Sequence, residues 1–271
     1  MDAATDLTRA LPRDARQLMR EGRWDRTTTG VCLGYLQANM AILRRDDAED
    51  FRAFCLANPR PMPLVDVTEP GDPTPRRVAP SADVRTDLPR YRVYRHGELV
   101  DEPTSIVDLW TDDMVAFLLG CSFSAENRLL DAGVRLRHME LGGNVPMFVT
   151  SIECRPAGRF HGPMVVSMRP IAGAQVDLAT RVTGELPLAH GAPIQVGEPE
   201  RIGVGDIEKP DFGDAIPLEP GEVPLFWACG VTPQAAIMAV KPELAITHAP
   251  GHMFVTDVPE RDILGKVAAT A

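Results

Sequence analysis

Residues 223–257, VPLFWACGVTPQAAIMAVKPELAITHAPGHMFVTD, decide the fold that the sequence predicts. The apolar run 223–229 has the length and composition of a buried strand. Thr232 followed by proline is typical of a helix start, and we expect a short helix over residues 234–240. Residues 243–248 then predict a second strand.

The connection between these two strands is long enough for a right-handed crossover, which predicts that the strands pair in parallel. Parallel pairing places Cys229 and His248 at the carboxyl edge of one sheet, where open α/β sheets bind ligands. His252 and the helix start at Thr232 follow close by in the chain. This stretch therefore predicts a site with a thiol of lowered pKa beside a helix N-terminus, and two imidazoles that could move protons.

The composition is that of a globular protein and excludes several classes. A net charge of −10 over 271 residues, without a basic stretch, argues against a nucleic-acid partner. No apolar run approaches the roughly 18 residues of a membrane span, and the N-terminus has no secretory signal pattern. Five cysteines without CxxC spacing favour reduced thiols and a cytoplasmic location.

Hydrophobic periodicity and end signals predict the remaining elements. We expect helices over residues 12–20, 46–58, 111–119, 125–131 and 173–183. We expect strands over residues 36–43, 64–67, 145–154, 162–169 and 194–196, and a hairpin over 91–100. The segment 69–82 contains four prolines and no hydrophobic periodicity, which predicts an exposed loop.

Two amides lie on one face of the expected strand 36–43. Gln37 and Asn39 are two residues apart, so both side chains point to the same side of the strand. Buried amides need hydrogen-bond partners. They could tie neighbouring loops to the strand, or they could line a ligand pocket.

A loop of small residues leads into the expected helix 125–131. Its hydroxyls, Ser122 and Ser124, could form an anion cradle at the helix start, or could be a turn residue and an N-cap. Glu126 in the first turn could match the helix dipole or act as a general base.

Arg169 ends the expected strand 162–169, and its planar guanidinium suits a substrate carboxylate. It could equally pair with an acid of the protein. His190 stands in a His-Gly turn, which makes it a turn residue or a further ligand of the substrate.

Six motifs together carry a resemblance to a known family. They are residues 34–39 (GYLQAN), 120–124 (GCSFS), 144–147 (NVPM), 165–170 (VVSMRP), 227–234 (WACGVTPQ) and 247–252 (THAPGH). In this order they resemble the hydro-lyase family related to D-glutamate cyclase, over residues 16–257. The resemblance implies an α/β fold, with a larger three-layer αβα lobe around a mixed sheet and a smaller two-layer α+β lobe. It also implies carbon–oxygen lyase activity.

On this basis we expect residues 1–118 and 200–271 to form the larger lobe and residues 119–199 the smaller one, with the pocket between them. Elimination of water needs a proton acceptor, a proton donor and a group that holds a carboxylate. The candidate catalytic residues are His248, His252, Cys229 and Glu126; the candidate substrate-binding residues are Arg169, Ser122, Ser124, Gln37, Asn39, His190 and Thr232.

The substrate would be a small carboxylate, with D-glutamate cyclised to 5-oxoproline as one candidate. No cofactor is expected, and a homo-oligomer is compatible with the sequence. Two alternatives stay open. One is a metal-dependent lyase or hydrolase that uses His248, His252, Cys229 and Asp257 as ligands, and the other is a non-catalytic carboxylate-binding protein.

Overall fold

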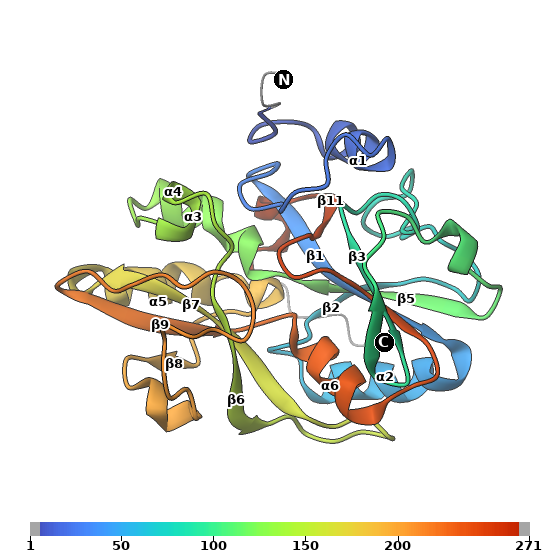
Figure 1. Cartoon of the computed structure of the whole chain (residues 1–271). Helices are drawn as coiled ribbons and strands as arrows, with labels where there is room; N and C mark the ends of the chain where they lie inside the picture. Colours follow the sequence, from blue (N-terminus) through green and yellow to red (C-terminus); the bar gives the residue numbers. More distant parts are fainter. Residues whose placement is uncertain (1–5, 266–271) are drawn as a thin grey trace.

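Two antiparallel sheets organise the computed structural model, which describes residues 6–265 (Figure 1). The larger sheet has the strand order β2-β5-β1-β10-β3-β4, and β11 also pairs with β1. Its strands are β1 (Tyr35–Arg44), β2 (Leu64–Val67), β3 (Tyr91–Arg95), β4 (Glu98–Asp101), β5 (Met114–Gly120), β10 (Ala245–His248) and β11 (Phe254–Pro259). The smaller sheet has the order β6-β7-β9-β8, with β6 (Met147–Glu153), β7 (Pro163–Ala172), β8 (Gln195–Val196) and β9 (Glu222–Ala228).

Six α-helices and several 3-10 turns surround the two sheets within residues 6–265. The α-helices are α1 (Pro12–Arg20), α2 (Arg45–Ala57), α3 (Glu126–Asp131), α4 (Arg137–Glu140), α5 (Val176–Gly184) and α6 (Thr232–Val240). The 3-10 turns are η1 (Val107–Leu109), η2 (Ser122–Ala125), η3 (Gly173–Gln175), η4 (Pro187–Ala189), η5 (Pro199–Ile202) and η6 (Glu260–Ile263). None of these helices is long and apolar enough to cross a membrane.

Strand β1 is the centre of the larger sheet, and both of its faces are buried. Successive side chains of a strand point to opposite faces. Met40 and Ile42 accordingly enter one hydrophobic core, and Ala41 and Leu43 enter another. Helix α2 covers the second face through residues such as Phe51, which explains why strand β1 is almost continuously apolar.

The other face of the larger sheet is covered by the chain between β2 and β3. Val78, Ala79 and Ala82 are buried there in the same core as Met40. The prediction of an exposed loop over residues 69–82 is therefore wrong for its second half. The absence of hydrophobic periodicity concealed these side chains, because an irregular segment can still bury isolated apolar residues.

The smaller sheet carries a layer of helices on one face. Leu129 of α3 and Ala179 of α5 pack there against Trp227 of β9. Residues of β6, β7 and β9, such as Phe226, form a separate core on the other face. The mixed helix and strand content agrees with the α/β class that the sequence predicts.

The predicted parallel pair of strands is wrong. Strand β9 pairs with β7 and β8 in the smaller sheet, whereas β10 pairs with β1 and β3 in the larger one. Helix α6 connects the two sheets, so the crossover rule, which holds within one sheet, does not apply. Every strand pairing of residues 6–265 is antiparallel, where the sequence predicts a mixed sheet.

The predicted helix over residues 111–119 is also wrong, because these residues lead into and form strand β5. All seven residues of β5 are buried between β1 and β2. A threonine followed by two aspartates imitates a helix start, but the apolar run behind it forms a central strand. The division into lobes at residues 118 and 199 stays a prediction, although β9 lies beyond residue 199 and belongs to the smaller sheet.

Candidate functional site

A chain of buried polar side chains crosses the smaller lobe. Arg169 on β7 donates from Nη2 to Glu126 Oε1 on α3 at 2.8 Å. His138 Nε2 on α4 lies 2.8 Å from the same carboxylate oxygen. The side chains of all three residues are at most 3% exposed.

Two serines and a tryptophan hold the guanidinium of Arg169 in place. Ser122 Oγ accepts from Arg169 Nη2 at 3.2 Å, and Ser167 Oγ accepts from Nη1 at 3.3 Å. Ser167 and Arg169 are two residues apart on β7 and therefore share one face of the strand. The guanidinium carbon lies 5.6 Å from the centroid of the Trp227 ring, within the range of a cation–π contact.

The electrostatics of this centre favour an ionised carboxylate. Burial raises the pKa of Glu126, but His138 and Arg169 lower it by charge and hydrogen bonding, and the net result is a lowered pKa. Buried charges of this kind are stable only when they are paired. Even so, three buried atoms have no hydrogen-bond partner among the described residues: Glu126 Oε2, Arg169 Nε and His138 Nδ1.

A small cavity adjoins Arg169. Its walls are Ser122, Ala125, Leu129, Arg169, Thr183, Ala189 and Trp227. It contains about 190 Å³ of empty space, but it is too narrow for a water-sized sphere. The cavity as it stands therefore has no room for a ligand.

The structure shows Arg169 paired with an acid of the protein, one of the two alternatives that the sequence leaves open. Of the two serines in the predicted anion cradle, Ser122 contacts the guanidinium. Ser124 instead accepts from the backbone N–H of Gln37 at 2.9 Å, so it connects η2 to β1. Thr232 donates to the carbonyl of Cys229 at 2.7 Å and accepts from the backbone of β7.

The two amides of β1 tie loops to the strand. Gln37 Nε2 donates to the carbonyls of Thr28 and Val31, at 3.0 Å and 2.9 Å. Asn39 Nδ2 donates to the carbonyl of Gly120 at 2.7 Å. A Cβ at Gly230 would lie only 1.9 Å from Asn39 Nδ2, so a glycine is required where this amide meets the start of α6.

Cys229 lies in one buried cluster with Cys121 and Phe123 of the serine loop, whereas the two imidazoles of the opening stretch make other contacts. His248 Nδ1 is 3.0 Å from the backbone nitrogen of Met40, and His252 Nδ1 is 2.9 Å from the carbonyl of Pro250. No described hydrogen bond or ion pair joins Arg169 to either histidine. That Cys229, the histidines, the serine loop and Arg169 share one cleft stays a prediction, and so do their catalytic roles.

Burial dominates the titration of these groups. It raises the pKa of Cys229 to about 11, so the predicted lowering by a helix N-terminus is wrong. Burial also lowers the pKa of His248 to about 4, and lowers that of His252. His248 is therefore neutral at pH 7, and not an imidazole poised near neutrality.

His190 lies close to the Arg169 cavity, directly after Ala189 in the chain. Its backbone has a φ of 73°, which agrees with a turn residue. Its Nδ1 lies 2.6 Å from the carbonyl of Arg60, while Nε2 is buried without a partner among residues 6–265. Burial lowers the pKa of this histidine to about 4, and the positive charge of Arg169 acts in the same direction.

The sequence reasoning missed His138. It stands in the short helix α4, twelve residues after Glu126, and no spacing rule connects the two. Only the tertiary structure brings α4 against α3. No pattern in the sequence distinguishes this histidine from one in a surface turn.

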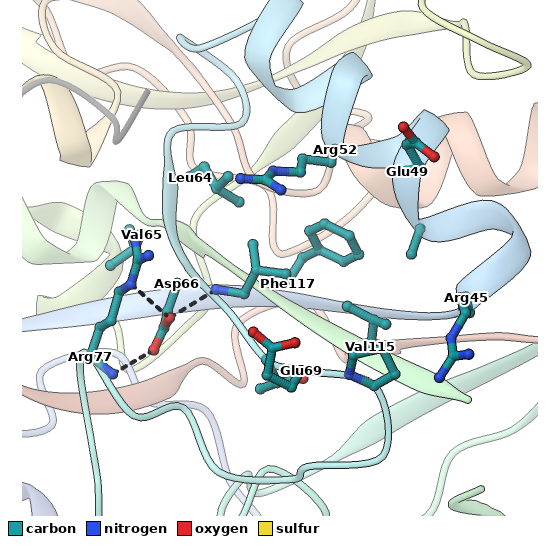
Figure 2. Close-up of a pocket in the computed structure, with 14 residues that line it drawn as sticks. Arg45, Glu49, Arg52, Leu64, Val65, Asp66, Glu69, Arg77, Val115 and Phe117 are labelled. Carbon is teal, nitrogen blue, oxygen red and sulfur yellow. Dashed lines mark hydrogen bonds and ion pairs between the residues drawn. The ribbon is translucent and has the colours of Figure 1, made fainter. Parts of the chain in front are cut away.

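A second hollow lies between α2 and strands β2 and β5 (Figure 2). Its volume is about 410 Å³. Its buried carboxylate, Asp66, already accepts hydrogen bonds from the backbone N–H groups of Val67 and Arg77, each at 2.9 Å. Since none of its lining residues has a buried polar atom without a partner, the Arg169 centre is the stronger candidate.

The described residues contain no group of three or more histidines, cysteines or acids that could hold a metal ion. Asp257, one member of the metal-ligand set considered from the sequence, instead pairs with Arg16 of α1 at 2.9 Å.

Comparison with known proteins assigns the family. The model of the family described as D-glutamate cyclase matches residues 115–257, which include Glu126, His138, Arg169 and Trp227. A protein of Geobacillus kaustophilus is 55% identical over 251 residues, which are 93% of this chain and 95% of the relative. The chain belongs to the D-glutamate cyclase family.

Other members of this family are similar over nearly their whole length. A protein of Stutzerimonas stutzeri is 56% identical over 93% of this chain and 95% of its own. YcsI of Bacillus subtilis is 53% identical over 93% of this chain and 98% of its own. All three relatives carry the name "Putative hydro-lyase". Among solved structures, a nitrogen repressor-like protein of Methanococcus jannaschii aligns over 77% of this chain and 80% of its own chain. The TM-score of 0.38 and the sequence identity of 8% are too low to support a shared fold.

Proposed function

We propose that this protein is a carbon–oxygen lyase that removes water from a small carboxylate-bearing substrate at the Arg169 centre. Membership of the D-glutamate cyclase family and the hydro-lyase names of its relatives support the reaction class. The observation that carries the site is the buried pair of Arg169 and Glu126, which retains unpartnered polar atoms beside a cavity.

The residues of this centre match the needs of an elimination. Arg169 Nε and the hydroxyl of Ser122 would bind the substrate carboxylate, because a guanidinium and a hydroxyl both donate to anionic oxygens. Glu126 Oε2 would accept a proton from the substrate, since the lowered pKa keeps this carboxylate ionised at neutral pH. His138 shares a hydrogen bond with Glu126 and would give a proton to the departing oxygen.

D-glutamate is the substrate that the family description suggests. In its cyclisation the neutral amine attacks the carbon of the side-chain carboxyl group, and a carbon–nitrogen bond forms. The carboxyl group reacts in its neutral form, and its hydroxyl oxygen takes a proton from His138 as the carbon–oxygen bond breaks. Water leaves, the amine loses a proton, and the product is 5-oxoproline. Arg169 would stabilise the negative charge that develops on the carboxyl oxygen, and Glu126 would take the amine proton.

A substrate screen tests this proposal. The purified protein is incubated with D-glutamate, L-glutamate and small 2-hydroxy acids, and the loss of one water is followed by mass spectrometry. We expect turnover of at least one compound, and a decrease of about 100-fold or more in Glu126→Gln, the usual range for loss of a general base.

Glu140→Gln is the matched control, because Glu140 is an exposed acid of the same lobe that pairs with Arg135 on the surface. Its activity should equal that of the wild type. Tight binding of a carboxylate without turnover of any compound would contradict the lyase and indicate a carrier. Full activity in Glu126→Gln would contradict the site.

A further inference from the structure

A larger hollow lies where the two lobes meet, on the outer side of helix α3. Its volume is about 670 Å³. The smaller lobe contributes residues of α3 and α5, and the larger lobe contributes the start of β1 and the end of β11. The lining residues are Gly34, Tyr35, Asn127, Arg128, Asp131, Ala132, Val182, Pro259, Glu260 and Arg261. None of them belongs to the Arg169 centre.

The hollow contains a buried carboxylate with one oxygen that has no hydrogen-bond partner within residues 6–265. Glu260 is only 5% exposed, and its Oε1 lies 3.6 Å from Arg128 Nε. Its Oε2 is buried and has no hydrogen-bond partner among the described residues. Burying a carboxylate oxygen without a donor costs free energy, so a group that donates to it is expected to bind here.

The two arginines of the hollow, Arg128 and Arg261, also pair with acids outside it. Arg128 donates from Nη2 to Glu185 at 2.9 Å, and the exposed Arg261 lies 3.8 Å from Asp262. Asp131 forms no ion pair in the described chain and accepts only from an amide, that of Asn127 at 3.2 Å. Asp131 and the unpartnered Oε2 of Glu260 are therefore the acceptors that the hollow offers to a ligand with N–H groups.

The walls indicate an organic ligand. Tyr35, Ala132, Val182 and Pro259 give the hollow apolar surface. An aromatic ring also attracts an organic cation. The described residues contain no cluster of acids, histidines or cysteines suited to a metal ion, and the volume is that of a site for a molecule of several heavy atoms.

We propose that this hollow binds a small organic ammonium compound, whose N–H groups donate to Glu260 and Asp131. The ligand would contact both lobes at once. It would also contact helix α3, whose first residue is Glu126 of the proposed lyase centre.

The affinity should depend on pH in a defined direction. Burial raises the pKa of Glu260 to about 7, although Arg128 and Asn127 lower it, and the negative charge of Asp131 raises it further. An ammonium group binds the ionised carboxylate, so binding should strengthen from pH 6 to pH 8. The charged or titratable groups that line the hollow are Arg128 and Asp131 of α3, Tyr35 of β1, and Arg261. Glu185 and Asp262 pair with Arg128 and Arg261.

Isothermal titration calorimetry of the full chain with 1,4-diaminobutane tests the proposal. Butylamine serves as the single-ammonium probe and 1-butanol as the neutral probe of similar size. We expect saturable binding of the two amines at pH 8, weaker binding at pH 6, and none of 1-butanol. Glu260→Gln should weaken amine binding by about tenfold or more, the typical effect of losing a charged hydrogen bond.

Asp131→Asn provides a variant that keeps the fold, because Asp131 is exposed, and it should weaken amine binding several-fold. Asp108→Asn removes an exposed acid from η1 and should leave binding unchanged. The proposal is overturned if neither amine binds at millimolar concentration, if 1-butanol binds equally, or if both Glu260→Gln and Asp131→Asn bind as the wild type does. None of these outcomes depends on lyase activity.

Discussion

Arg169 carries a charge inside the smaller lobe at 2% exposure, and Glu126 is its anionic partner. Such a pair contributes little net stability compared with apolar residues, but removing one member leaves an uncompensated buried charge. Replacing one member of the pair should therefore lower the free energy of unfolding far more than replacing both members by apolar residues. This sensitivity separates a buried functional charge from the many surface ion pairs of the chain.

We predict that Glu126→Gln lowers the free energy of unfolding by about 3–5 kcal/mol, the range for breaking a buried pair. The double variant Glu126→Gln/Arg169→Met should recover a large part of this loss. Urea unfolding followed by circular dichroism measures both. Glu140→Gln, which breaks a surface pair, should cause no measurable change. A double variant less stable than Glu126→Gln would contradict the explanation.

Cys229 gives a second prediction for a single residue. Because burial raises the pKa of its thiol to about 11, the reactive thiolate is rare at neutral pH. Iodoacetamide at pH 7.4 should therefore label Cys229 in the native protein much more slowly than in the urea-unfolded protein. Peptide mass spectrometry gives the labelled fraction with time. Rapid labelling of the native protein would contradict the raised pKa and support the activated thiol that the sequence predicts.

Among the elements, the last residue of β5 shows how closely this strand approaches the turn η4. A Cβ at Gly120 would lie 1.6 Å from the carbonyl oxygen of Leu188, which follows the first residue of η4. The carbonyl of Gly120 also accepts the amide of Asn39. The strand end, the turn and the central strand β1 therefore meet around a backbone that has no room for a side chain.

We predict that Gly120→Ala lowers the free energy of unfolding by about 3 kcal/mol, at the upper end for overpacking, because a backbone carbonyl must move. Gly205→Ala is the matched control. Nothing lies within 4 Å of a Cβ at Gly205, and its φ is in the ordinary range, so this variant should be as stable as the wild type or slightly more stable. Equal melting temperatures for both variants would show that the strand end can relax.

Local patterns predicted several elements well. Helix α1 has the predicted bounds of Pro12–Arg20, because a proline at its first position and a glycine after its end mark both limits. The β3–β4 hairpin was also found from alternation and a His-Gly turn. Strand β5 was missed because a short apolar run is compatible with either element, and its pairing with β1 and β2 is a long-range property.

In the whole molecule, the pairing of strands was the part that the sequence could not predict. The stretch after residue 223 shows where β9, α6 and β10 lie, but not that α6 passes from one sheet to the other. The contacts within the candidate site depend on tertiary structure in the same way. Residue types alone make Glu126, Arg169 and Ser122 candidates, whereas the contact of Glu126 with His138 depends on how α4 packs.

The buried histidines give a prediction for the stability of the whole chain. His190 and His248 have pKa values of about 4 in the folded protein, below the unfolded value of about 6.5. Their contribution is fully present above pH 6.5 and is lost as the pH falls toward 4. Burial of His252 acts in the same direction, whereas the raised pKa of Glu260 opposes it, because the folded state binds that proton more tightly.

We therefore predict that Glu260→Gln makes the acid sensitivity steeper by removing the opposing group. In this variant the free energy of unfolding should decrease by about 3 kcal/mol between pH 7 and pH 5, from two buried histidines that the unfolded chain protonates. Urea unfolding at both pH values provides the measurement, and the wild type should show a smaller decrease. A constant free energy in the variant would mean that these histidines are solvated.

The central position of β1 has a consequence for synthesis on the ribosome. One edge of β1 pairs with β5, and the other edge pairs with β10 and β11, which are synthesised last. Met40 of β1 and His248 of β10, which contact each other, are 208 residues apart in the chain. The nascent protein must therefore carry an open, strongly apolar strand edge during most of its translation. Such an edge is a template for pairing with a neighbouring chain. Chaperones that bind nascent chains at the ribosome should therefore matter more for the yield of this protein than for its stability once folded.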